Sequence, residues 1–176
     1  QIGIGALGDA VAQGCILRQH KNREYRDIIE GLTCVANEVT TDCGVFDEGL
    51  YVSTEMFVNG MMHLIERGVV KRRVFDNLIL QQGLNSGLIS DAIDAVLYDY
   101  ARRQGLLPQR FDETSLQEAC YWGLLPQDAR LQGDRLVLGD VSCANDMNDP
   151  ATREAVLACS EGCRLRHGRI LHGGFF

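Results

Sequence analysis

A short pattern recurs four times in the middle of this chain, and it restricts the fold more than any other feature. Each copy is a glycine followed by two apolar residues, and successive copies begin 19, 18 and 18 residues apart. They are Gly68-Val69-Val70, Gly87-Leu88-Ile89, Gly105-Leu106-Leu107 and Gly123-Leu124-Leu125. A glycine with positive φ just past a helix, followed by an apolar residue that folds back, is a common helix C-terminus. We therefore predict an array of short helices over residues 57–125, too irregular in charge and length for a solenoid.

The flanking regions predict strands and further helices. Residues 6–20 have the apolar spacing of a helix, which we expect to continue through the charged residues 21–32. Polar residues 37–49 predict a loop. The remaining expected elements are, in chain order, strands at 1–5, 50–52, 136–138 and 169–176, and a helix from Pro150 to about Ser160 with Asp149 as its N-cap. Both apolar ends look cut from a longer chain.

Composition restricts the partners. The net charge is −7 and the isoelectric point is near 5.0, which argues against nucleic acid or an anionic membrane as a partner. No apolar run approaches the roughly 18 residues that span a bilayer. We expect a soluble, cytoplasmic protein, and self-association stays open.

Cysteine usage favours free thiols. The seven cysteines are an odd number in a chain that is large enough to form a core without disulfide bonds. Cys159 and Cys163, with His167 and His172 nearby, lack the paired spacing of structural zinc sites. We therefore predict no metal and no bound cofactor.

Glu55 is the first candidate for chemistry. It follows the expected strand at 50–52 and precedes residues 56–67, which have helical spacing. A carboxylate at such a junction can face a cleft, and the positive end of the helix dipole keeps it ionised. The alternative is structural, in which Glu55 only caps the helix, with Thr54 as the N-cap. Spacing alone leaves both interpretations open.

A second pattern lies near the N-terminus. Gly3-x-Gly5-x-x-Gly8 matches the dinucleotide-binding fingerprint in form. That fold also needs a second strand about 20 residues later, ending in an acidic residue that binds the ribose. Residues 21–27 are instead charged and helical in pattern. Nicotinamide binding therefore stays a lesser alternative, although these glycines can let a ligand approach the backbone at a helix N-terminus.

Three segments together resemble one known family. They are QIGIGALGDAV at residues 1–11, VSTEMFVNG at residues 52–60 and HGGFF at residues 172–176. In this order they are similar to the C-terminal half of the acetyl-CoA hydrolase/transferase family of CoA-transferases, whose long bacterial members carry a helical insertion between such motifs. Gly8, Ser53 and Asn59 depart from the residues common in relatives, namely proline, histidine and aspartate.

The resemblance implies a fold and an activity. The fold is α/β and helix-rich, a partial CoA-transferase-like parallel-sheet domain at residues 1–68 and 169–176 with an inserted helical subdomain at 69–168. The activity is that of a CoA-transferase or acyl-CoA hydrolase in acetyl-CoA metabolism, with coenzyme A as a substrate. Glu55 attacks an acyl-CoA to give an acyl-glutamyl anhydride, which becomes a glutamyl-CoA thioester.

The resemblance also implies the substrates and the binding residues. The partners are acyl-CoA and either a carboxylate acceptor or water, and Gly3, Gly5 and Gly60 belong to the substrate site. On this interpretation the chain alone lacks a complete CoA pocket and is inactive by itself. The alternative from another class is a non-catalytic interaction or scaffold module whose helices provide a docking face.

Overall fold

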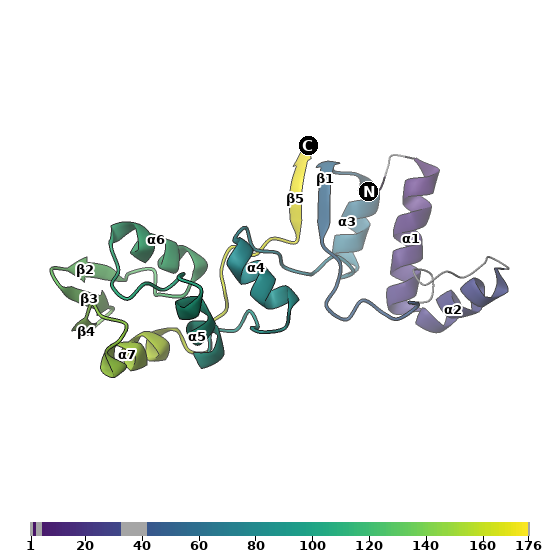
Figure 1. The fold of residues 1–176 in the computed structure, drawn as a ribbon. Coiled ribbons are helices and arrows are strands. Elements are labelled where there is room, and N and C mark those ends of the chain that lie inside the picture. The colour runs from purple at the N-terminus through teal and green to yellow at the C-terminus, as the bar shows by residue number, and fades with distance from the viewer. Residues whose placement is uncertain (1, 3–4, 33–41, 176) are drawn as a thin grey trace. The chain divides into compact units, whose positions relative to one another are not determined.

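The computed structural model describes residues 2, 5–32 and 42–175, which fall into two compact units. The first unit contains residues 1–74 and 169–176, and the second contains residues 75–168. The described residues form seven helices and five strands in one parallel and one antiparallel sheet, a mixed α/β arrangement (Figure 1). Residues 69–74, which the sequence analysis grouped with the helical insertion, lie in the first unit.

One pairing of distant strands organises the first unit. Its elements are α1 (Ala6–His20), α2 (Asn22–Gly31), β1 (Val52–Met56), α3 (Asn59–Glu66) and β5 (Leu171–Phe175). Strands β1 and β5 run parallel, with Val52 opposite Leu171 and Thr54 opposite Gly173. Parallel strands require a crossover connection, and here that connection contains the whole second unit.

The entrance to this connection lies beside its exit. Val74 and Arg169 exchange two backbone hydrogen bonds of 2.9 and 2.8 Å. Both residues belong to the first unit. The second unit therefore begins and ends at adjacent points of the first.

The helices of the first unit follow the sequence pattern with two corrections. Helix α1 confirms the prediction for residues 6–20. Residues 22–31 form a separate helix because Lys21 leaves the helical region, with φ −135° and ψ 53°. The second correction concerns α3, which begins at Asn59 and not at residue 56. Around Leu64, Val69 and Val70 a small core forms, to which Ala12 of α1 contributes.

The second unit combines four helices with an antiparallel sheet. In chain order its elements are α4 (Leu78–Asn85), α5 (Ala95–Arg103), α6 (Glu113–Trp122), β2 (Arg130–Gln132), β3 (Arg135–Leu138), β4 (Val141–Ala144) and α7 (Pro150–Ser160). Helix α7 and strand β3 confirm the predictions there. Each helix begins at an Asn or Asp whose side chain accepts a backbone hydrogen bond from the first turn: Asn77, Asp94, Asp112 and Asp149.

The four recurring glycines end helices as predicted. Gly68, Gly87, Gly105 and Gly123 have φ of 65°, 68°, 81° and 81°. After each of the first three, the next residue donates its N–H to a carbonyl of the last helical turn, for example Leu106 to Ala101 at 2.8 Å. These bonds satisfy carbonyls that the helix end would leave free. The predicted array of short helices is confirmed as α3 to α6.

The second unit has a large core of its own. Trp122 is 5% exposed and contacts Phe75 edge-on, with ring centroids 6.3 Å apart. The hydroxyl of Tyr98, also buried, donates to the carbonyl of Leu124, which accepts a second bond from Ser160 at 3.4 Å. Burial raises the pKa of Tyr98 to about 12. Among the described residues, no helix is both long and apolar enough to span a bilayer.

The helix-ending glycines allow a matched test. Gly105→Ala should lower the free energy of unfolding of the second unit by about 1 kcal/mol, because alanine is strained at φ +81°. Gly123→Ala should lower it by at least about 1 kcal/mol more, because its Cβ would also lie 2.9 Å from Cγ of Arg166. Fluorescence of Trp122, the only tryptophan, follows unfolding of this unit in denaturant. Equal losses would show that the Arg166 contact has no effect.

Tyr98 should make stability fall at high pH. An unfolded tyrosine ionises near pH 10, whereas folded Tyr98 has a pKa of about 12. The stability linked to neutral Tyr98 is therefore present below pH 10 and is lost as pH rises from 10 to 12, in total about 3 kcal/mol. Tyr98→Phe should flatten this dependence in denaturant titrations at each pH. An unchanged slope in the variant would contradict the assignment to Tyr98.

Candidate functional site

Glu55 lies near the carboxyl end of β1, with its side chain exposed. The strand continues to Met56, which pairs with Phe175 of β5. In Figure 1 the arrowheads of β1 and β5 lie at the same end of the first unit as the first turn of α3. The carboxyl ends of parallel strands are where open α/β sheets usually bind ligands. Glu55 is thus an accessible carboxylate at such an edge.

The structure rules out the capping interpretation of Glu55. Helix α3 begins at Asn59, and its N-cap is Val58, which is extended and has no side-chain capping bond. The Thr54 hydroxyl bonds instead to the backbone of Met56, at 2.7 Å from its oxygen and 3.2 Å from its nitrogen. The strand therefore continues past the expected boundary, and neither Thr54 nor Glu55 caps the helix.

The predicted glycines have different local roles. Gly5 directly precedes α1 at φ 107° and ψ −176°, a conformation open essentially only to glycine, and it is exposed. Gly60 is buried in the first turn of α3, where an added Cβ would lie 3.2 Å from Cβ of Ala12. The absence of a side chain at Gly60 therefore lets α1 and α3 pack closely. Gly3 lies outside the described residues.

Strand β5 brings a histidine beside β1. His172 pairs with Ser53, and its Nδ1 forms a hydrogen bond with the hydroxyl of Tyr51. The next residue, Gly173, has φ +75°, and an added Cβ would overlap the carbonyl oxygen of Thr54. Only glycine fits there. From sequence, His172 was a possible zinc ligand and part of the HGGFF segment, but its contact with Tyr51 was not predicted, because residues so far apart in the chain leave no local pattern.

A groove of about 700 Å³ runs between α1 and α3. Its walls include Ala12, Ile16 and Gly60, with Asp9 and Asn59 toward the first turns of the two helices. His20, Lys21, His63 and Arg67 line the rest of it toward the helix ends. No sequence pattern predicts this groove, because only the packing of α3 against α1 creates it.

Two alternatives for cofactors find little support. The residues that a dinucleotide-binding fold would use for its second strand form helix α2. Within the described residues, no three His, Cys, Asp or Glu side chains gather as a metal site requires.

Comparison with protein-family models, curated proteins and solved structures finds no match to this chain.

Gly173 should control the strand pairing beside Glu55. Gly173→Ala should separate β5 from β1, because its methyl group would overlap the Thr54 carbonyl and its φ is unfavourable for alanine. Hydrogen exchange of the Val52 amide, which donates to the Ile170 carbonyl at 3.1 Å, should accelerate at least tenfold. Gly68→Ala, a glycine with positive φ and open space around it in the same unit, is the control. Equal protection of Val52 in both variants would contradict the steric argument.

Proposed function

We propose that this chain is part of an acyl-CoA hydrolase or CoA-transferase in which Glu55 is the nucleophile. The observation that supports this most is the position of Glu55, an exposed carboxylate at the carboxyl end of the parallel pair β1 and β5. The three sequence segments that resemble the acetyl-CoA hydrolase/transferase family point to the same residue. The substrates are an acyl-CoA and either a carboxylate or water.

The chemistry needs an ionised, accessible carboxylate. A Glu55 oxygen attacks the thioester carbonyl, the carbon–sulfur bond breaks, and CoA leaves as a thiolate with an acyl-glutamyl anhydride remaining. The thiolate then attacks the glutamyl carbonyl, releasing the first carboxylate and forming a glutamyl-CoA thioester. Attack by an acceptor carboxylate, with return of the thiolate to the acceptor, regenerates Glu55. With water in place of the acceptor, the products are CoA and the free Glu55 carboxylate.

The surroundings of Glu55 suit this role in two ways. Its side chain is exposed, so a substrate can reach the carboxylate. Gly173 of the neighbouring strand lies opposite Thr54 and permits the close strand pairing that fixes this edge. Main-chain N–H donors placed at such an edge can stabilise the oxyanion that forms at the thioester carbonyl. A weak oxygen nucleophile becomes effective when it is held against its target in this way.

Trapping the covalent intermediate tests the proposal. The full-length protein is incubated with acetyl-CoA and then with hydroxylamine or borohydride, and the modified peptide is mapped by mass spectrometry. We expect modification at Glu55 and a fall in turnover of more than about a thousandfold in Glu55→Gln, because the amide cannot form the anhydride. Stability should change by less than about 0.5 kcal/mol, since the side chain is exposed.

Glu66→Gln is the matched control. Glu66 is exposed on α3 of the same unit, and its side chain pairs with His63 at 3.3 Å. This variant should keep full turnover. Turnover that survives in Glu55→Gln would exclude the nucleophile and favour the alternative of a non-catalytic interaction module.

A further inference from the structure

The groove between α1 and α3 has a defined direction. Gly60 of α3 packs on Ala12 of α1, and further along both helices His20 Nε2 donates to the carbonyl of Arg67 at 2.7 Å. The two helices therefore run the same way, with their first turns at one end of the groove. Asp9 and Asn59 mark that end, and Lys21 marks the other.

The walls of the groove change character along its length. Ala12, Ile16 and Leu17 give it an apolar floor, and the amide side chains of Gln13 and Asn59 add hydrogen-bonding groups. Its volume of about 700 Å³ falls within the range of sites for small organic ligands.

The far end of the groove carries positive charge. Lys21 and Arg67 both line it, and the His20 bond to the Arg67 carbonyl fixes the end of α3 beside α1. Two carboxylates lie nearby: Glu24 pairs with Lys21 at 3.2 Å, and Glu66 pairs with His63 at 3.3 Å. All four side chains of these pairs are about 60% exposed, so the pairs are weak and Lys21 can turn to another anion.

We propose that this groove binds the phosphate-bearing arm of coenzyme A, with its phosphates at Lys21 and Arg67. This inference rests on the proposed function, because it takes CoA as the substrate. The amide groups of the pantetheine arm then meet Gln13 and Asn59, and its methylene groups lie over Ala12 and Ile16. The thioester lies toward Asn59, at the end nearer to Glu55.

The dimensions agree with this direction of binding. From Asp9 to Lys21 the groove follows twelve residues along α1, a length of about 18 Å. Glu55 precedes Asn59 by four residues, so the backbone of Glu55 lies within about 14 Å of Asn59 at that end of the groove. Figure 1 shows the first turns of α1 and α3 at the same end of the first unit as the arrowheads of β1 and β5. An extended ligand can therefore reach from the cationic end toward the edge that carries Glu55.

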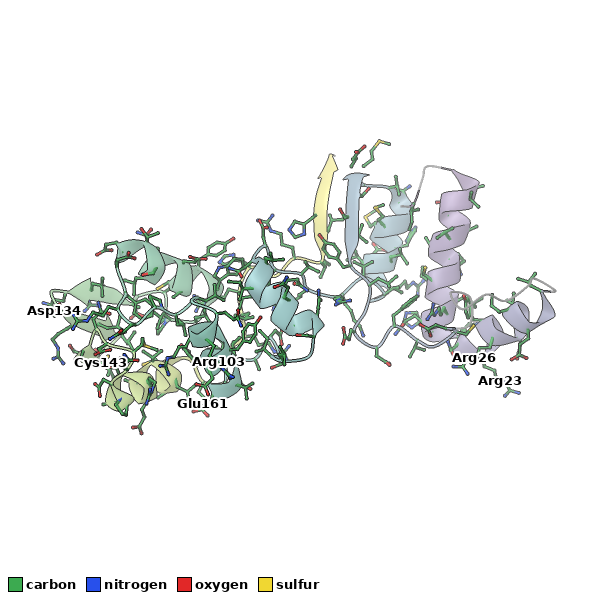
Figure 2. The ribbon with its side chains drawn as sticks, viewed as in Figure 1. Arg23, Arg26, Arg103, Asp134, Cys143 and Glu161 are labelled. Carbon is green, nitrogen blue, oxygen red and sulfur yellow. The ribbon has the colours of Figure 1, made fainter. Side chains whose placement is uncertain are left out.

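Calorimetric titration of the full-length protein with CoA and with pantetheine, which has no phosphate, tests the proposal. The double variant Lys21→Gln with Arg67→Gln should bind CoA at least tenfold more weakly and pantetheine with unchanged affinity. CoA binding to the double variant should also depend less on salt concentration than binding to the unchanged protein, because two ionic contacts are lost. Arg23→Gln is the control for charge, because Arg23 is exposed on α2 and projects from it in Figure 2. It should bind CoA within twofold of the unchanged chain.

The outcomes separate this inference from the proposed function. Equal CoA affinity in the double variant and the unchanged chain, or no CoA binding at millimolar concentration, would overturn the groove assignment. An acyl adduct at Glu55 in that case would leave the proposed function intact. Conversely, Glu55→Gln should bind CoA normally. CoA binding that depends on Lys21 and Arg67 while no adduct forms at Glu55 would support the groove and reject the nucleophile.

Discussion

The first unit depends on the parallel pairing of β1 with β5. Because β5 follows β1 only after the whole second unit, the pair forms only when the chain returns after residue 168. Gly173 permits the close approach to the Thr54 carbonyl that this pairing requires. The same pairing places His172 within hydrogen-bonding reach of Tyr51. The edge that carries Glu55 is therefore built from residues more than 100 positions apart.

The sequence predicts those parts of the fold that local interactions decide. The glycines after α3 to α6 were predictable because each needs a positive φ, and only glycine adopts it without strain. Helix α7 was predictable from Asp149 and Pro150 for a similar reason. Strands β2 and β4 were missed, because their three and four residues gain their identity only by pairing with β3. Pairing across a sheet depends on tertiary contacts that no short window of sequence contains.

The candidate site shows the same division. Glu55 could be identified from sequence as an acidic residue following an apolar strand, but the expected helix start beside it was wrong. Val58 stays extended, so three residues separate Glu55 from α3. Gly60 was identified as a binding residue, and its visible contact is with Ala12 of α1. The groove required knowledge of how α1 and α3 pack, which depends on their small side chains meeting at one place.

The two backbone hydrogen bonds between Val74 and Arg169 join the points at which the chain leaves and re-enters the first unit. The entropic cost of closing such a loop rises only slowly with its length, so the size of the second unit has little effect on the folding of the first. The second unit can therefore form a separate core without altering the register of β1 and β5. Such an arrangement is modular: this position could hold segments of different size, gained or lost over evolution, while the edge with Glu55 kept its geometry.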